Sequence, residues 1–155
     1  MMSKMKFKRM VVTVTLIGAF LIFGMGVKNA QSANIDEAAF YALVTVFYVG
    51  NAEVSTGYVF EGYSLDYLYE AYSYYVIAAE QAYNSYYYAY NSSAYYAYDA
   101  YTAAYNAWLY LLNAADYQYS GWYYDNASYT GLALQNSGIA ARYLAYVLYY
   151  AAYLS

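Results

Sequence analysis

The 155-residue chain contains no cysteine, no histidine and no proline. Without cysteine, neither disulfides nor a lipid-modified cysteine can form, so a folded domain must be stabilised by packing. Histidine and cysteine are the usual ligands of zinc, copper and haem, and histidine is the commonest proton carrier in catalysis. The sequence therefore predicts no cofactor, no metal site and no catalytic residue, and a protein that is not an enzyme. The absence of proline is compatible with long helices.

Positive charge is also scarce, and most of it precedes residue 34. Lys4, Lys6, Lys8 and Arg9 are followed by an uncharged, mostly apolar run at 11–26 and by small residues at 30–33. This order is typical of a secretory signal peptide that is cleaved after residue 32 or 33. An uncleaved anchor helix is the alternative, although the apolar run is short for a membrane span. We expect a signal peptide at 1–33, a single domain at 34–155 and a secreted, periplasmic or extracellular location.

The predicted domain is strongly acidic, because Arg142 is its only cation against ten carboxylates. This balance argues against nucleic acid as a partner, and against anionic membranes once the signal is cleaved. Asp66 and Glu70 share a helix face and are of the type that hydrolyses glycosides or binds calcium. They are spaced like the asparagines and serines around them, so we interpret them as part of a solvated stripe.

Tyrosine is the most unusual feature that is present, with thirty residues in the chain. In the segments 64–91 and 94–116, aromatic residues and alanines recur every three or four residues, which is the period of a bundled helix and not of a strand. We expect these stripes to face the core. The predicted inner positions include Tyr72, Tyr75, Tyr86, Tyr98, Tyr101, Tyr105 and Trp108.

Local signals divide the predicted domain into four helices. The first runs from about Ile35, with Asn34 as a possible N-cap, to Gly50 or Gly57. The others run from Ser64 to Tyr90, from Ser93 to Tyr117, and from Asn126 or Ser137 to Leu154. Short links between four long helices predict an all-α, up-down four-helix bundle. An extended helical hairpin or rod is the alternative, because Asn91-Ser92-Ser93 is a weak stop.

Consecutive tyrosines span most of a helix circumference, so some rings must face outward. The predicted outward set is Tyr87, Tyr88, Tyr95 and Tyr96, and exposed aromatic area of this kind is typical of an interaction surface. We expect a structural protein that self-associates, as a homo-oligomer or an extracellular polymer in a matrix, filament or cell-surface layer. The alternative is a non-catalytic binding module that holds carbohydrate or aromatic ligands by ring stacking.

Overall fold

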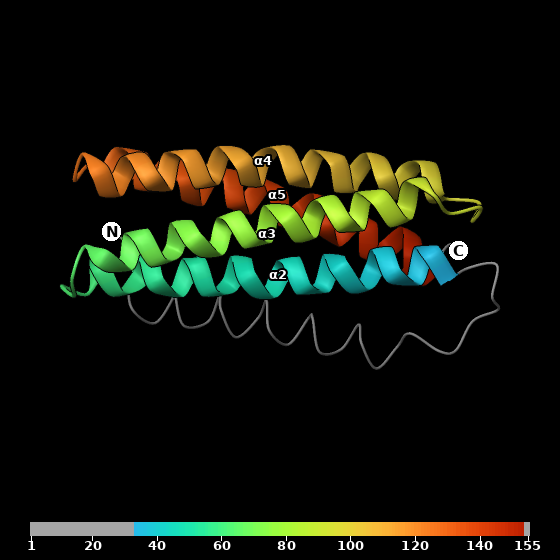
Figure 1. Ribbon diagram of the computed structural model, residues 1–155, viewed down its shortest axis with the longest axis horizontal. Helices are drawn as coiled ribbons and strands as arrows, with labels where there is room; N and C mark the ends of the chain where they lie inside the picture. The colour runs from blue at the N-terminus through green and yellow to red at the C-terminus, as the bar shows by residue number, and fades with distance from the viewer. Residues whose placement is uncertain (1–32, 154–155) are drawn as a thin grey trace.

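The computed structural model of the protein describes residues 33–153, so the predicted signal peptide lies outside the described residues except for its last position, Ala33. The described chain is an up-down bundle of four long helices: α2 (Ala33–Phe60), α3 (Asp66–Tyr90), α4 (Ala97–Tyr123) and α5 (Ala127–Tyr153) (Figure 1). The predicted fold class is confirmed. The rod alternative is wrong, because the chain reverses direction between α3 and α4.

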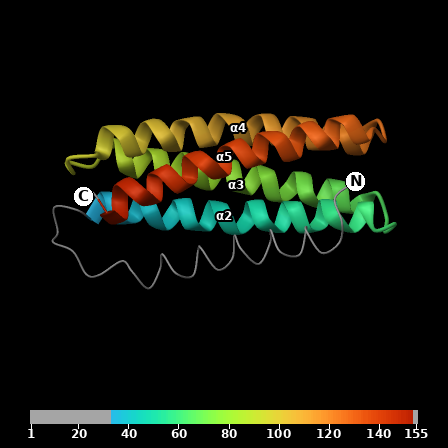
Figure 2. The ribbon, with the colours of Figure 1, turned by 180° about the vertical axis from the view of Figure 1, so that it is seen from behind.

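The helices pack in a ring, each on its neighbours in the order α2, α3, α4, α5. α2 and α4 are therefore diagonal partners, and their outer faces point to opposite sides of the bundle. Figure 2 shows that α5 is inclined, running from the carboxyl end of α4 towards the amino end of α2.

The first helix is longer than its glycines suggested. The predicted ends near Gly50 and Gly57 are both wrong, because α2 continues to Phe60 and the turn follows at Gly62. Gly62 has a φ of 93°, a left-handed backbone that a residue without a Cβ adopts freely.

The three predicted N-caps, Asn34, Ser64 and Ser93, have different outcomes. Asn34 is not a cap, since α2 begins one residue earlier. Its side-chain amide nitrogen instead donates a hydrogen bond to the backbone carbonyl of Asn91 (2.8 Å). The Ser64 hydroxyl oxygen accepts a hydrogen bond from the amide of Asp66, the first residue of α3 (3.2 Å). Ser93 is not the cap of α4, which begins only at Ala97.

The last connection also differs from the prediction. α4 does not end near Tyr117 but continues to Tyr123, and Gly121 is a buried residue within it. α5 begins directly after Asn126, whose side-chain oxygen accepts a hydrogen bond from the Ser128 amide (2.9 Å). Of the two predicted starts of this helix, the one near Asn126 is confirmed.

Small residues, chiefly alanine, form the core. Each helix turns towards the bundle axis a stripe of buried residues that repeats every three and four positions, as in antiparallel coiled coils. These stripes are Ile35, Ala38, Ala42, Thr45, Val49, Ala52 and Thr56 in α2; Leu68, Ala71, Tyr75, Ala78, Ala82, Ser85 and Ala89 in α3; Ala97, Ala100, Ala104, Ala107, Leu111, Ala114, Gln118 and Gly121 in α4; and Thr130, Ala133, Ser137, Ala140, Leu144, Val147 and Ala151 in α5.

The predicted tyrosine core is therefore largely wrong. Among the predicted inner positions, Tyr75 alone is fully buried. Tyr98 and Tyr105 are exposed, at 66% and 41%. The remaining four, Tyr72, Tyr86, Tyr101 and Trp108, are half-buried at the edge of the core.

The periodicity was identified correctly, but the core stripe lies one residue before the aromatic one. In α4, for example, Ala97 and Ala100 are buried while Tyr98 and Tyr101 follow them on the surface side. Alanine allows helix axes to approach closely, towards the lower end of the usual 8–10 Å range, and leaves little room for a phenol ring between them. A tyrosine one position further on can lay its ring over the neighbouring helix while its hydroxyl reaches water.

Candidate functional site

The outer surface of the α3–α4 seam carries aromatic residues directly after most core positions, with Val76, Ala79, Leu112 and Ala115 at the middle of the seam. We call the aromatic residues the α3–α4 aromatic stripe. It comprises Tyr69, Tyr72, Tyr83, Tyr86 and Tyr90 of α3 and Tyr98, Tyr101, Tyr105, Trp108, Tyr119 and Trp122 of α4.

Rings of the α3–α4 aromatic stripe pair across the seam at both ends. Towards the α3–α4 turn, the ring centroids of Tyr90 and Tyr101 are 5.4 Å apart, and those of Tyr83 and Trp108 are 5.1 Å apart. At the other end, Tyr69 and Trp122 are separated by 4.9 Å. These distances and the tilted or edge-on geometries are those that aromatic pairs prefer. The stripe is therefore an ordered surface.

The α2–α3 and α4–α5 seams are covered by tyrosines that precede core positions. In an antiparallel bundle these positions meet across the seam, and several of their rings stack nearly parallel. The stacked pairs are Tyr41–Tyr88 (5.3 Å, 10° between planes), Tyr110–Tyr143 (5.8 Å, 17°), Tyr117–Tyr129 (6.4 Å, 21°) and Tyr96–Tyr150 (6.1 Å, 25°). Tyrosine thus seals three of the four seams from outside.

The fourth seam, between α2 and α5, has no tyrosine at the corresponding positions. They hold small or aliphatic residues and Glu53 instead: Ala39, Leu43, Val46, Gly50, Glu53 and Gly57 in α2, and Gly131, Leu134, Gly138, Ala141, Ala145 and Leu148 in α5. A Cβ added at Gly50, Gly131 or Gly138 would meet no atom of residues 33–153 within 4 Å, so no side chain of the described part of the chain packs against these points.

A buried polar cluster lies beneath the α2–α5 seam. Glu53 is only 7% exposed, and its Oε1 is 3.1 Å from the hydroxyl oxygen of Ser137. Burial raises the pKa of Glu53 to about 7, and the Ser137 hydrogen bond partly opposes this rise. The Ser137 hydroxyl also lies 2.9 Å from the Leu134 carbonyl, an acceptor only. Because a hydroxyl has one proton, Ser137 can donate to the Glu53 carboxyl or to the Leu134 carbonyl, but not fully to both.

Tyr75 completes the cluster from α3. Its side chain is fully buried, and its hydroxyl has no hydrogen-bond partner among the described residues. Burial raises the pKa of Tyr75 well above its ordinary value, and the nearby Glu53 carboxylate raises it further. The nearby Ser137 hydroxyl partly lowers the pKa of Tyr75, but the two hydroxyls do not form a hydrogen bond. With a pKa of about 7, the Glu53 carboxyl in this cluster is protonated in mildly acidic conditions and ionised in alkaline ones.

The predicted outward set is not brought together on one surface. Tyr95 is 86% exposed and Tyr87 is 53% exposed, whereas Tyr88 and Tyr96 are half-buried. Tyr88 stacks on Tyr41 over the α2–α3 seam, while Tyr96 stacks on Tyr150 over the α4–α5 seam. The four residues lie near the same end of the bundle but on different sides of it.

Sequence reasoning missed a shallow groove at one end of the α3–α4 aromatic stripe. It has a volume of about 490 Å³ and is lined by Asp66, Tyr69, Tyr119 and Trp122. The Asp66 carboxylate is exposed and accepts a hydrogen bond from Ser64 (3.1 Å). The three aromatic residues were recognisable from their spacing, but their meeting with Asp66 depends on how α3 and α4 align.

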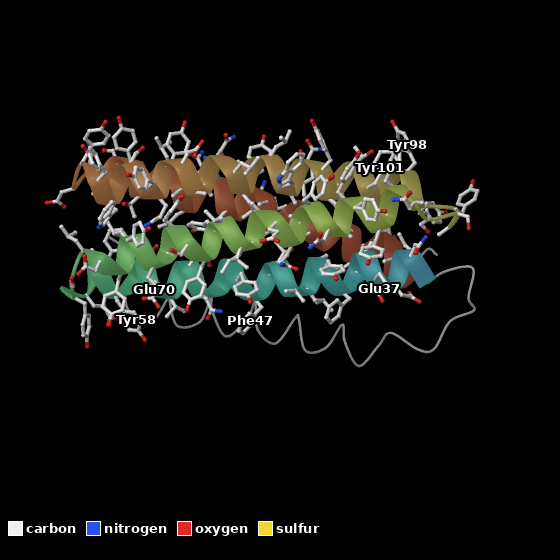
Figure 3. All side chains as sticks on the ribbon, viewed as in Figure 1. Glu37, Phe47, Tyr58, Glu70, Tyr98 and Tyr101 are labelled. Atoms are coloured by element: carbon white, nitrogen blue, oxygen red, sulfur yellow. The ribbon has the colours of Figure 1, made fainter. Side chains whose placement is uncertain are left out.

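Sequence reasoning also missed an apolar stripe on the outer face of α2, which we call the α2 phenylalanine stripe: Phe40, Val44, Phe47, Val54 and Tyr58. Phe40 and Phe47 are 55% and 64% exposed. Figure 3 shows Phe47 projecting from α2 away from the rest of the bundle. The spacing of three and four residues, with Asn51 between Phe47 and Val54, was visible in the sequence beside the core stripe of the same helix.

Other candidate features carry little chemistry. Within residues 33–153, no three histidine, cysteine, aspartate or glutamate side chains gather where they could hold a metal ion. Asp66 and Glu70 are both exposed, and Glu70 accepts a long hydrogen bond from Tyr74 (3.4 Å). By length and composition α2 could cross a membrane, but 44% of its most apolar window is buried inside the bundle. A core helix of a soluble protein passes the same test.

Comparison of the chain with protein-family models, with curated proteins and with solved structures finds no match.

Proposed function

We propose that the protein is a secreted, non-enzymatic structural protein that self-associates through its tyrosine-rich helix faces, in a matrix, a filament or a cell-surface layer. The observation that supports this proposal best is that the small residues lie in the core and the large aromatic residues lie on the surface. Alanine fills the core, while nearly all the described tyrosines lie at or near the surface, where the fold does not require their full ring area.

The α3–α4 aromatic stripe is well suited to hold another copy. Its exposed rings offer apolar area together with hydroxyl groups that can donate and accept hydrogen bonds at an interface. The stripe consists of tyrosine and tryptophan alone, and burial, followed by the neighbouring phenols of Tyr98, Tyr90 and Tyr86, raises the pKa of Tyr101. The surface therefore adds no charge to an acidic molecule when two copies meet.

Sedimentation velocity of the purified chain over a wide concentration range tests this proposal. We expect the weight-average sedimentation coefficient to rise with concentration. A Tyr98→Ser/Tyr105→Ser variant removes two exposed rings of the stripe, and its rise should be shifted to at least tenfold higher concentration. A matched Tyr146→Ser variant on the outer face of α5 should behave like the wild type. A wild-type protein that stays monomeric throughout contradicts the proposal.

A second candidate function is carbohydrate binding, favoured by the groove of Asp66, Tyr69, Tyr119 and Trp122. Its volume lies within the usual range for small-molecule sites, its rings suit stacking on the apolar face of a sugar, and its carboxylate can accept hydrogen bonds from sugar hydroxyls. The chain has two tryptophans, so Trp108→Ala is a matched control for Trp122→Ala. Calorimetric titration with soluble cello- and chito-oligosaccharides should show binding that Trp122→Ala alone abolishes; no binding to the wild type contradicts this function.

A further inference from the structure

The outer face of α2 is more apolar than those of α3 and α4, with Asn51 as its one polar position between Phe40 and Tyr58. On it Phe40, Val44, Phe47, Val54 and Tyr58 recur at helical spacing, and Phe40 and Phe47 are more than half exposed. Phenylalanine has no hydroxyl to satisfy with water, so its exposure is more costly than that of tyrosine. The corresponding stripes of the next two helices are mainly polar: Glu70, Ser73, Ile77, Glu80 and Asn84 in α3, and Asp99, Thr102, Asn106, Leu109, Asn113 and Asp116 in α4.

We propose that the α2 phenylalanine stripe is a second self-association surface, whose partner is the same stripe of another copy, packed antiparallel about a two-fold axis near Val44. This inference rests on the proposed self-association and names a surface that the tyrosine-rich faces do not include.

Charge favours a second copy as the partner. Between Glu37 and Glu61 the only carboxylate of α2 is Glu53, which points inward and is almost completely buried. Two copies of an acidic chain repel one another wherever their carboxylates approach. The middle of the α2 face is a place where two copies can meet without that repulsion.

The stripe is also complementary to itself. A two-fold contact pairs each residue with a residue equally far from the axis on the other copy. With the axis at Val44, Phe40 of one copy lies within one residue of the level of Phe47 of the other, so four phenylalanine rings surround the paired valines, and Val54 lies opposite Asn34. The same operation places Glu37 opposite Asn51, whose amide can donate a hydrogen bond to the carboxylate. An apolar centre with a polar rim is the usual anatomy of an interface.

The available area predicts a weak contact. About an axis at Val44 the segment 37–51 packs on itself, and it is about 22 Å long at the helical rise of ~1.5 Å per residue, while a helix is about 10 Å wide. Two such faces bury on the order of 450 Å², below the ~1,200–2,000 Å² of stable interfaces. The α2 contact should therefore be populated only at high concentration or together with the α3–α4 aromatic stripe, which raises the effective concentration.

The α2 phenylalanine stripe and the α3–α4 aromatic stripe lie on opposite sides of the bundle. Phe47 and Tyr98 project from opposite sides of the bundle (Figure 3). A two-fold contact alone closes at a dimer, whereas two separate contacts on opposite sides allow growth into an open assembly. The α2 phenylalanine stripe would thus supply one contact of a filament or layer, and the aromatic stripe the other.

Cysteine crosslinking tests the two-fold contact, because the chain has no cysteine of its own. A Val44→Cys variant places the thiols of two copies beside each other near the axis. We expect mild oxidation to convert most of it to a disulfide-linked dimer at concentrations where the wild type associates. Gln135→Cys, at an exposed site on α5, is the matched control and should dimerise at least tenfold more slowly.

A substitution tests the same contact without a new bond. Phe47→Gln should raise the concentration needed for association at least tenfold, whereas Tyr146→Gln should leave it unchanged. Circular dichroism verifies that both variants keep the helical fold, as expected for exposed positions.

The outcomes separate the two proposals. If the wild type associates but Phe47→Gln has no effect and Val44→Cys crosslinks no faster than its control, the α2 contact is wrong and self-association stands. A monomeric wild type overturns both. If Phe47→Gln instead abolishes binding to anionic or neutral phospholipid vesicles while association is unchanged, the stripe faces lipid and the α2 contact is likewise overturned.

Discussion

Glu53 is a buried carboxyl group whose surroundings change its pKa. Burial raises its pKa from 4.5 to about 7, so the folded protein favours the protonated form. A folded-state pKa above the unfolded one means that the unfolding free energy falls as pH rises from about 4.5 to about 7, and is level above that. At 1.36 kcal/mol per pKa unit, the loss is roughly 3 kcal/mol. Glu53 thus makes the bundle more stable in mildly acidic than in alkaline conditions.

Replacement of Glu53 by glutamine removes this dependence. Glu53→Gln keeps the shape and an acceptor oxygen for Ser137 but cannot ionise, so we expect it to stabilise the protein by about 2–3 kcal/mol at pH 8 and by less than about 1 kcal/mol at pH 5. Urea unfolding at the two pH values measures the difference. Glu80→Gln, at an exposed site on α3, should change neither value by more than about 0.5 kcal/mol. Equal effects of Glu53→Gln at both pH values would show that Glu53 is not buried as described.

At the scale of the helix, the size of the side chain decides which stripe faces inward. The aromatic stripes of α3 and α4 follow the same heptad period as the core stripes, and both are apolar. A sequence period can therefore reveal the helices and their bundling without revealing which of two adjacent stripes is buried. Helices that approach closely leave room only for small residues such as alanine. Such an approach occurs at Gly121 of α4, where not even a Cβ would fit against Thr130 of α5.

Gly121 provides the test of close approach. A Cβ at this position would lie 2.5 Å from the Thr130 hydroxyl oxygen and 3.2 Å from its amide nitrogen on α5. Gly121→Ala should destabilise the protein by about 1–2 kcal/mol, because the overpacking exceeds the gain in helix propensity. Gly138→Ala, where a Cβ meets nothing within 4 Å, should instead stabilise it by up to about 1 kcal/mol. Thermal or urea unfolding compares the two variants; the same sign for both would contradict the packing described.

The whole molecule combines an acidic charge with a largely uncharged aromatic exterior. The domain predicted at 34–155 carries one arginine and ten carboxylates, so every copy repels every other at long range. Attraction between rings acts only at contact and depends little on salt. The balance between the two should set the concentration at which copies associate.

This balance predicts a salt dependence with a definite sign. Raising the ionic strength from about 0.01 M to about 0.15 M shortens the Debye length from ~30 Å to ~8 Å and screens the repulsion. The concentration for half-association should fall at least threefold over this range, as measured by sedimentation or light scattering. Dissociation by salt would instead indicate that ion pairs hold the copies together, contrary to an aromatic interface.

The sequence by itself determined that residues 33–153 form an all-helical bundle of four helices with a heptad period, because helical spacing and turn residues are local properties of the chain. It also showed that tyrosine exceeds what an interior can hold. Only the tertiary structure decided that alanine forms the core and tyrosine seals its seams, and that α2 turns phenylalanines outward. It also brought Glu53, Ser137 and Tyr75 together from three helices. These features depend on how closely the helices approach and how they are rotated, which many side chains acting together settle and no single segment encodes.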